Sequence, residues 1–222
     1  MIKTLILPAY NEEKYIADIV NRGKKYADRV IVIDNNSSDN TFIEAQKAGA
    51  ITLHHKSNLG KAGSLKTGCE AAIKLGTEII AFMDSDGQHK PEDLPRFYEL
   101  FTNEELDIVI GSRKGGDKMP FVRKVGTNLL MYVTRLLFKV DIKDIQSGYR
   151  VFRADIYPTI KWNSSGSSHY FADAEITVRI GLNKLRYKEI FIDTIFIDEY
   201  KGMNPLEGLK LLLTIIIWRF SL

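Results

Sequence analysis

The sequence contains one cysteine, Cys69, among its 222 residues. A lone cysteine can form no intrachain disulfide and no thiolate cluster for a structural zinc site, so any metal should be a hard cation bound through oxygen. Long hydrophobic runs are also missing. No segment reaches the roughly 18 apolar residues of a transmembrane helix, and the apolar start at residues 1–8 is too short for a signal peptide. These absences predict a cytosolic protein without a membrane span.

Two common nucleotide-binding motifs are absent as well. No Gly-x-Gly-x-x-Gly follows the first expected strand, which argues against a dinucleotide-dependent dehydrogenase. Residues 63–68 have the glycine spacing of a phosphate-binding loop, but Cys69 and Glu70 stand where lysine and serine or threonine are needed. If phosphate is bound, a metal ion and cationic side chains would therefore have to balance its charge.

Charge is unevenly distributed along the chain. The net charge is only +3, and we expect no nucleic-acid partner. Residues 1–110 carry 13 Lys/Arg against 17 Asp/Glu, whereas residues 111–161 carry 11 against 4. The basic stretch is either a solvated surface or a binding surface for an anion. An acidic front half and a basic middle suggest two tasks within one fold.

Short apolar runs alternate with helical patterns through the first half. Strands are expected at residues 2–7, 29–34, 50–53, 78–83 and 107–110, and helices at 13–25, 41–48, 61–75 and 91–101. This alternation predicts βαβ units, that is, an α/β fold with a mostly parallel central sheet flanked by helices. Ligands of such sheets bind at the carboxyl ends of the strands.

The second half is less regular. Helices are expected at residues 121–138, 170–180 and 205–220, strands at 185–190 and 194–197, and a loop or short strand at 144–150. No linker divides the chain. We therefore expect one domain over residues 1–222, with a nucleotide- and metal-binding half at 1–110 and an acceptor-binding half at 111–222.

Polar turns follow three of the expected strands, at residues 8–12, 34–37 and 84–89. The sharpest is Asp84-Ser85-Asp86, because two carboxylates follow a buried run and Gly87 allows the chain to turn so that Gln88 joins them. Carboxylate and amide oxygens suit Mg²⁺ or Mn²⁺ completed by a ligand's phosphates. The alternative is an ordinary solvated turn or helix cap.

Six segments carry a resemblance to a known family: residues 8–13, 32–39, 58–63, 84–89, 110–113 and 144–150. In order and spacing they resemble the family-2 glycosyltransferases of the GT-A fold, in the branch that contains the dolichyl-phosphate mannose synthases. The resemblance covers about two thirds of the chain. It departs at Asn35, where the family often has a second aspartate, and at residues 199–205, where the family's arginine, serine and lysine are replaced.

The resemblance implies roles for individual residues. The nucleotide would be bound by Pro8, Ala9, Tyr10, Glu12, Ile33, Asp34, Asn35, Lys61, Ser85 and Asp86. The metal, Mg²⁺ or Mn²⁺, would be held by Asp84, Asp86 and Gln88. The acceptor phosphate would be bound by Arg113, Arg123, Arg150 and Lys201. Asp86 and Arg113 would be the catalytic residues.

The expected reaction moves a hexose from a nucleoside-diphosphate sugar, GDP-mannose or a UDP-sugar, to a polyprenyl or dolichyl phosphate with inversion. A phosphate monoester is largely dianionic at pH 7, so this nucleophile needs positioning rather than deprotonation. A hydroxyl acceptor would instead need a base, for which Asp173 or Glu175 are candidates unless they lie on an exposed helical face.

Two further alternatives stay open. A nucleotidyltransferase would need a basic, glycine-rich loop after the first strand, where this chain is acidic at residues 8–13. A non-catalytic nucleotide-sugar-binding subunit is disfavoured by the intact Asp84, Asp86, Gln88 and Arg113.

The last expected helix is apolar almost all round, and basic residues border the apolar residues 129–138. We therefore expect peripheral attachment to the cytoplasmic face of a membrane, or a homodimer or membrane-subunit partner bound through residues 205–222. The sequence leaves open whether the natural chain continues past Leu222.

Overall fold

A computed structural model describes residues 1–113, 121–160, 162, 169–193 and 204–221. A seven-stranded sheet forms the centre, in the order β3-β2-β1-β4-β6-β5-β7. All its pairings are parallel except those of β6, which runs antiparallel between β4 and β5. The strands are β1 (Lys3–Ala9), β2 (Arg29–Asp34), β3 (Ile51–His54), β4 (Ile79–Phe82), β5 (Ile108–Arg113), β6 (Arg150–Arg153) and β7 (Tyr187–Ile192).

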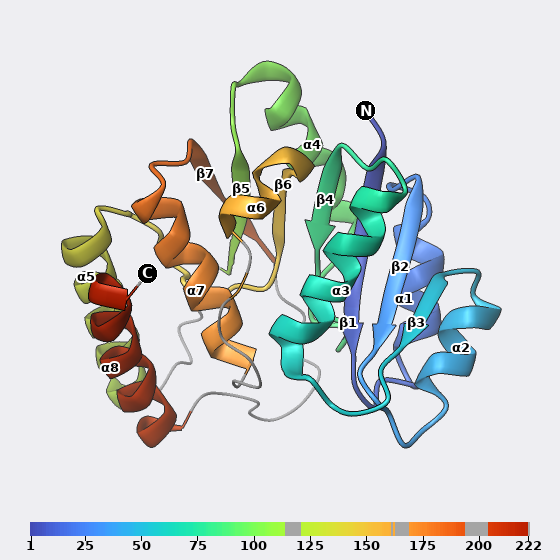
Figure 1. The fold of residues 1–222 in the computed structure, drawn as a ribbon, viewed down its shortest axis with the longest axis horizontal. Coiled ribbons are helices and arrows are strands. Elements are labelled where there is room, and N and C mark those ends of the chain that lie inside the picture. The colour runs from blue at the N-terminus through green and yellow to red at the C-terminus, as the bar shows by residue number, and fades with distance from the viewer. Residues whose placement is uncertain (114–120, 161, 163–168, 194–203, 222) are drawn as a thin grey trace.

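Helices cover both faces of the sheet (Figure 1). One face packs against α1 (Ile16–Gly23), α2 (Thr41–Lys47) and α4 (Leu94–Asn103). The other is covered by α3 (Gly60–Lys74), α6 (Tyr157–Ile160) and α7 (His169–Leu182), and α5 (Phe121–Phe138) and α8 (Pro205–Ser221) pack against α7 and each other. The expected α/β class with a mostly parallel, helix-flanked sheet is confirmed.

Strand β1 shows why these sequences fold as buried strands. Successive side chains of a strand point to opposite faces. Leu5 and Leu7 pack into the core on the α1 side, whereas Ile6, between them, packs into the core on the α3 side. A central parallel strand is therefore apolar at every position, which is the pattern that identified it in the sequence.

Strand β6 differs from the sequence expectation, which assigned residues 144–150 to a loop or short strand. The strand begins at Arg150, where that segment ends, and has only four residues. Its first three residues are buried without alternation, because Val151 packs into the core on one face of the sheet and Phe152 into the core on the other. The expected strand at 185–190 corresponds to β7, and the one at 194–197 lies outside the described residues.

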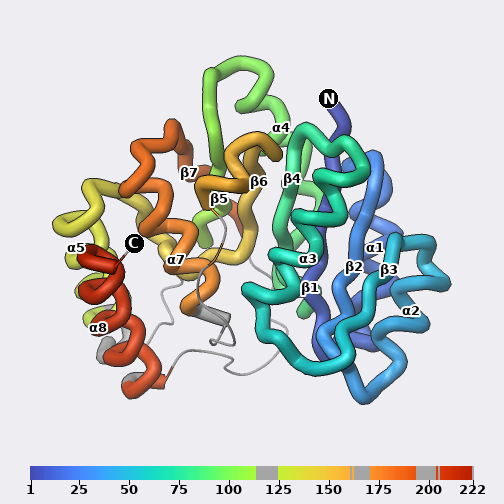
Figure 2. The backbone as a smooth tube through the Cα atoms, in the orientation of Figure 1, coloured from blue at the N-terminus to red at the C-terminus, as the bar shows by residue number. Residues whose placement is uncertain are grey.

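The backbone trace shows how the two halves of the chain share the sheet (Figure 2). The first third of the chain, blue to cyan, lies on one side of the molecule, and α7 and α8 lie on the other. Strand β6 from the second half sits between β4 and β5 from the first. Because β1, β2, β4 and β5 are parallel, their carboxyl ends meet at one edge of this shared sheet.

Candidate functional site

A cavity of about 340 Å³ opens at the carboxyl edge of the sheet. Residues from both halves of the chain line it: Pro8, Ala9, Tyr10, Glu12, Asn35, Lys61, Ser64, Asp84, Ser85, Asp86, Gln88, Arg113, Gln146 and Asp173. The three polar turns after β1, β2 and β4 therefore do meet, as the parallel sheet requires.

Most of the predicted site residues line this cavity, but four of those that the structure describes do not. Ile33, Asp34, Arg150 and Glu175 are buried and absent from its lining. The side chain of Arg123 and all of Lys201 fall outside the described residues.

The end of β2 holds its polar side chains in a fixed network. The Asn35 amide donates to Asn58 Oδ1 at 2.8 Å, and Asn35 Oδ1 accepts from the backbone N–H of Leu59 at 2.9 Å. These bonds tie the cavity-lining Asn35 to the start of α3. Asp34 lies behind it, with Oδ2 2.6 Å from His54 Nδ1. Its carboxylate therefore already has a partner within the protein.

The turn after β4 has the shape that the sequence predicts. Gly87 adopts a φ of +79°, a left-handed conformation that favours glycine, and the backbone N–H of Gln88 donates to Asp86 Oδ1 at 3.0 Å. Asp86 and Gln88 thus reach the same cavity within one tight turn. Their oxygens fit a hard cation such as Mg²⁺ or Mn²⁺.

Such a cation would need further ligands from outside the protein. Within the described ranges, no group of three or more His, Cys, Asp or Glu side chains is arranged to hold a metal ion. Protein-bound Mg²⁺ commonly uses one or two carboxylates and completes its shell with water and substrate phosphates. Asp86 and Gln88 fit that kind of site.

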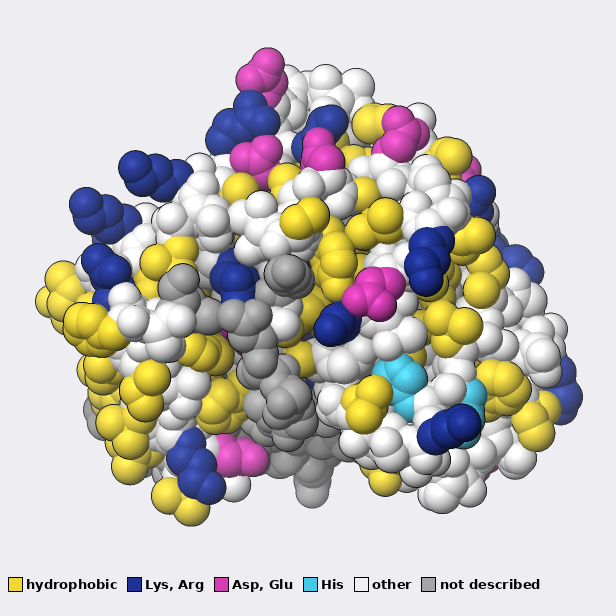
Figure 3. All heavy atoms as spheres, viewed as in Figure 1, with side chains coloured by type: hydrophobic (Ala, Val, Ile, Leu, Met, Phe, Trp, Pro, Cys, Tyr) yellow, Lys and Arg dark blue, Asp and Glu magenta, His cyan; other side chains and the backbone are white. Residues whose placement is uncertain are grey.

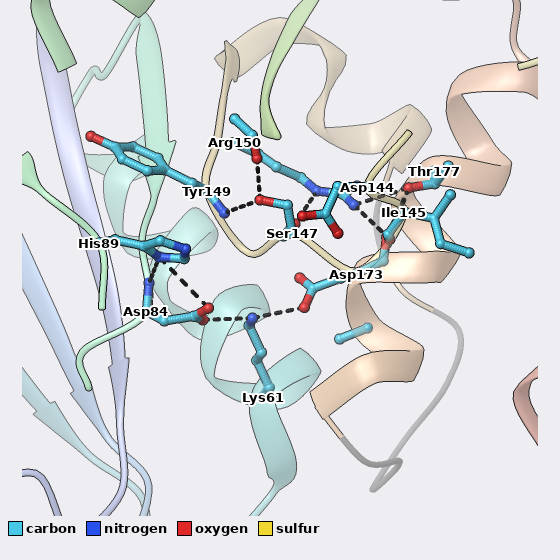
Figure 4. A network of polar contacts seen from close by, with 12 residues as sticks. Lys61, Asp84, His89, Asp144, Ile145, Ser147, Tyr149, Arg150, Asp173 and Thr177 are labelled. Atoms are coloured by element: carbon cyan, nitrogen blue, oxygen red, sulfur yellow. Dashed lines mark hydrogen bonds and ion pairs between the residues drawn. The ribbon is translucent and has the colours of Figure 1, made fainter. Parts of the chain in front are cut away.

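Asp84 has a different partner from the one expected. Lys61 Nζ lies 2.6 Å from Asp84 Oδ1 and 2.8 Å from Asp173 Oδ2 (Figure 4). The side chains of Lys61 and Asp173 are 5% and 4% exposed, and that of Asp84 is 30% exposed. Lys61 therefore forms an ionic bridge from α3 to the strand end of β4 and to α7.

This bridge sets the protonation of its members. Burial by itself would raise the pKa of Asp84, but Lys61 holds that pKa well below its usual range. Burial would lower the pKa of Lys61, whereas Asp173 and Asp84 raise it above the ordinary lysine value. Burial raises the pKa of Asp173, and Lys61 opposes the rise. The ammonium group is thus firmly charged between its two carboxyl partners.

Residues 144–150 form a loop that closes the cavity from the second half of the chain. Asp144 accepts from Arg113 Nε at 2.7 Å and from Nη2 at 2.9 Å, a bidentate pair. Gly148 lies directly against the ionic bridge, because a Cβ there would be 2.5 Å from Asp84 Oδ2 and from Lys61 Nζ. Only glycine lets the loop approach this closely.

Arg150 braces this loop from inside the protein. It is fully buried and donates to the carbonyl oxygens of Ser147 and Ile145 and to Thr177 Oγ1, at 2.9 to 3.2 Å. The expected contact of Arg150 with an acceptor phosphate finds no support in this position. Instead, Arg150 ties the loop to α7.

The two candidate bases occupy different environments. Asp173 lines the cavity, whereas Glu175 is completely buried and accepts from Arg179 Nη2 at 3.0 Å. The interpretation of these residues as an exposed helical face is wrong, because α7 lies inside the molecule between α3, α5 and α8. Only Asp173 of this pair can reach a ligand in the cavity.

Sequence reasoning missed two cavity residues, Ser64 and Gln146. Ser64 lies one helical turn after Gly60, and its hydroxyl donates to the Gly60 carbonyl at 3.3 Å. Gln146 lies within the 144–150 motif, between residues that the fold holds firmly. The motif itself was a signal for Gln146, but nothing in the sequence shows which of its side chains faces the cavity.

The chain resembles known glycosyltransferases over most of its length. The family described as glycosyl transferase family 2 matches residues 4–161. A UDP-N-acetylglucosamine–dolichyl-phosphate N-acetylglucosaminyltransferase from Methanococcus voltae is 32% identical, with 98% of this chain and 96% of that protein covered. An undecaprenyl-phosphate mannosyltransferase from Micrococcus luteus is 29% identical, with 91% and 86% covered.

Among solved structures, the chain resembles glucosyl-3-phosphoglycerate synthase from Mycobacterium tuberculosis in complex with Mn²⁺, UDP-glucose and phosphoglyceric acid. The TM-score is 0.72 at 19% identity, with 100% of this chain and 80% of that chain covered. At this identity the likeness concerns the fold, and it agrees with the expected GT-A architecture. The family match spans most of the sheet and the cavity-lining turns, and the chain belongs to glycosyltransferase family 2.

Proposed function

We propose that this glycosyltransferase transfers a hexose from a nucleoside-diphosphate sugar to a polyprenyl or dolichyl phosphate, with inversion and with a divalent cation. The observation that carries the proposal is the cavity that joins the polar ends of β1 and β2, the Asp86–Gln88 turn and Arg113. The relatives named for dolichyl- and undecaprenyl-phosphate support the choice of acceptor. The Methanococcus voltae relative makes UDP-N-acetylglucosamine the first donor to test.

The charges of the cavity support a cation-dependent donor site. Among its described lining residues, four carboxylates (Glu12, Asp84, Asp86 and Asp173) face two cationic groups, Lys61 and Arg113. Both cationic groups are already paired with carboxylates. A diphosphate would meet net repulsion here unless a divalent cation at Asp86 and Gln88 balanced it. When bound, that cation would neutralise charge on the leaving diphosphate.

Arg113 is the described residue best suited to position the acceptor. Its side chain is 37% exposed and lines the cavity, and Asp144 fixes one edge of the guanidinium. Arginine binds phosphate oxygens through a planar set of N–H donors, and an acceptor dianion needs alignment rather than a base. In this scheme Arg113 aligns the phosphate nucleophile, while Asp86 and Gln88 would hold a cation that balances the charge of the donor's diphosphate.

A transfer assay tests this function. Labelled UDP-N-acetylglucosamine, UDP-glucose and GDP-mannose are each incubated with polyprenyl phosphate in vesicles, with Mn²⁺ or with EDTA. We expect cation-dependent labelling of the lipid with one donor and at least a 100-fold loss in Asp86→Ala. Asp155→Ala, at an exposed aspartate away from the cavity, is the matched control and should keep full activity. Unchanged transfer in Asp86→Ala, or in EDTA, contradicts the scheme.

One observation favours a second candidate, transfer to a hydroxyl acceptor. Asp173 lines the cavity, and burial raises its pKa, so it is placed where a general base would be needed. The assay therefore includes an arm with 3-phosphoglycerate in place of the lipid. Transfer to this acceptor, lost in Asp173→Asn, would favour the second candidate over lipid phosphate.

We further propose that the enzyme works at the cytoplasmic face of a membrane, with its α5/α8 surface on the lipid. No helix in the described part of the chain is long and apolar enough to cross a bilayer. Helices α5 and α8 pack together and expose large apolar side chains, each between 47% and 86% accessible: Leu129, Tyr132, Leu136, Leu209, Leu213, Ile217 and Phe220. Figure 3 shows these helices as a hydrophobic area at the left of the molecule.

The charges around this surface suit an anionic membrane. Helix α5 has no acidic residue, and α8 has one, Glu207. Exposed basic side chains lie on or beside the two helices at Arg135, Lys139, Lys210 and Arg219. An apolar face with a basic rim binds the interface of anionic lipids. This arrangement would bring the cavity to the lipid acceptor without a membrane span.

Vesicle co-sedimentation tests the surface. We expect Leu136→Glu and Leu213→Glu each to reduce binding to anionic vesicles at least tenfold, because a leucine buried in the interface contributes about 1.5–3 kcal/mol. The matched control is Ile43→Glu, which replaces an exposed isoleucine on α2 and should bind as the wild type does. Equal binding by all variants overturns this proposal. A change from dimer to monomer in light scattering would instead assign the surface to a second copy.

A further inference from the structure

Lys61 lies beside the predicted cation site and binds one of its expected ligands. Figure 4 shows the ammonium group between Asp84 and Asp173, with Nζ 2.6 Å from Asp84 Oδ1. The sequence predicts Asp84 as an oxygen ligand together with Asp86 and Gln88. A lysine of the chain and a divalent cation from solution can therefore bind the same carboxylate.

Asp84 is accessible from the cavity. Its side chain is 30% exposed and lines the cavity together with Asp86 and Gln88. His89 Nδ1 lies 3.7 Å from Asp84 Oδ2, which is too far for a hydrogen bond. The close ionic contact of this carboxylate is thus the one with Lys61. Withdrawal of Lys61 would leave Asp84 Oδ1 open to a cation that enters through the cavity.

Asp173 allows Lys61 to leave Asp84 without becoming an unpaired buried charge. Lys61 Nζ lies 2.8 Å from Asp173 Oδ2, and the two side chains are 5% and 4% exposed. An ammonium group has three N–H donors, so its bond to Asp173 does not depend on the bond to Asp84. A buried charge that loses every partner is strongly disfavoured. Because Asp173 remains as a partner, this penalty does not prevent an exchange at Asp84.

The charges near Asp86 make the exchange depend on a diphosphate. Asp86 and Gln88 alone offer a divalent cation only one negative charge, and the neighbouring Lys61 ammonium repels it. A diphosphate supplies further oxygen ligands and negative charge. Its presence therefore shifts the preference of Asp84 from the ammonium to the divalent cation.

We propose that Lys61 competes with the divalent cation for Asp84 and thereby makes cation binding depend on the diphosphate of the nucleotide. Lys61 is a positioning residue here, because it acts on the cation through Asp84. By thermodynamic linkage, nucleotide and cation then tighten the binding of each other by the same factor. This inference rests on the proposed function, since that function supplies the nucleoside diphosphate.

Mn²⁺ titration, with the free ion measured by electron paramagnetic resonance, tests the competition. Without nucleotide, Lys61→Met should bind Mn²⁺ at least tenfold more tightly than the wild type, because Asp84 is released and a repelling charge is gone. The tightening of Mn²⁺ binding by saturating UDP or GDP should be at least tenfold smaller in this variant. Lys66→Met, at an exposed lysine of the same helix, is the matched control and should stay within twofold of the wild type.

Double variants separate competition for Asp84 from a general loss of positive charge. Asp84→Asn added to Lys61→Met should abolish the gain in Mn²⁺ affinity, because it removes the released ligand. Asp173→Asn added to Lys61→Met should keep most of the gain, because Asp173 lies on the far side of Lys61 from Asp84. Equal effects of the two additions would overturn the proposal.

The single variant Asp84→Asn decides if Lys61→Met fails to fold in thermal melting. Without nucleotide it should change Mn²⁺ affinity less than threefold, because Lys61 holds the carboxylate; with UDP or GDP it should weaken binding at least tenfold. An equal loss in both conditions, or unchanged Mn²⁺ affinity in folded Lys61→Met, overturns the competition alone. Wild-type protein that binds no Mn²⁺ with either nucleotide refutes the proposed function as well.

Discussion

Replacing Lys61 with methionine would remove the ammonium group between Asp84 and Asp173 while keeping most of the side-chain volume. Asp84 and Asp173 would then lie close together without the ammonium group that balances their charge. Removing one partner of a buried ion pair costs about 3–5 kcal/mol in the free energy of unfolding. Asp84 is 30% exposed, so water screens part of the effect, and we expect a loss of about 3 kcal/mol at pH 7.5.

The loss should shrink as the pH falls. Burial raises the pKa of Asp173, and removal of Lys61 takes away the group that opposes this rise. A carboxyl whose folded pKa lies above its unfolded value of about 3.9 binds more protons in the native state, so the variant gains stability from neutral pH down toward 4. In the wild type, burial would raise the pKa of Asp84, but Lys61 lowers it below its usual range. The stabilisation from the Lys61–Asp84 ion pair is therefore present at neutral pH and is lost below about pH 4.

Chemical unfolding followed by circular dichroism at pH 7.5 and pH 5.0 measures both effects. Lys66→Met changes an exposed lysine on the same helix and should alter the free energy of unfolding by no more than about 0.5 kcal/mol. A cost below about 1 kcal/mol for Lys61→Met would refute the buried bridge. A cost that does not shrink at pH 5.0 would refute the role given to Asp173.

Three further predictions concern other parts of the molecule. Gly148→Ala should lower transfer at least tenfold in the lipid assay, because its Cβ would lie 2.5 Å from Asp84 and Lys61 atoms. Arg150→Met should lower the free energy of unfolding by about 3 kcal/mol in urea titrations, because the Ser147 carbonyl loses the bond from Arg150 and the Ile145 carbonyl keeps only the 3.3 Å bond from Thr177 Oγ1. Cys69 is buried, and burial raises its pKa, so Ellman's reagent should label it slowly in native protein and rapidly in guanidinium.

The first half of the site could be predicted from the sequence for a simple reason. Continuous apolar runs identify β1, β2 and β4, and parallel strands bring their polar ends to the same edge. That rule places the turns that carry Tyr10, Asn35 and Asp86 at this edge, and the resemblance singled out these residues within the turns. Glycine at position 87 likewise predicted the turn that carries Gln88 to the cavity.

The second half could not be predicted in the same way. Lys61 and Asp173 are 112 residues apart and meet only through the packing of α3 against α7. Sequence patterns report which residues are buried but not which distant charges pair. Strand β6 escaped detection because it is short and buried on both faces, so it shows no alternation. The resemblance assigned Arg150 to an acceptor phosphate, whereas the structure buries its side chain completely, which is rare for a charged residue.

The order of strands also has a consequence for biosynthesis. Strand β5 ends at Arg113, yet its neighbours in the sheet are β6 and β7, the latter ending at Ile192. At 5–20 residues per second, a ribosome would leave the apolar β5 without β6 for roughly 2–8 s after making it, and without β7 for roughly 4–16 s. An unpaired apolar strand can form hydrogen bonds with a strand of another chain and so start aggregation. Newly made chains should therefore depend on chaperone binding to this segment until β7 emerges.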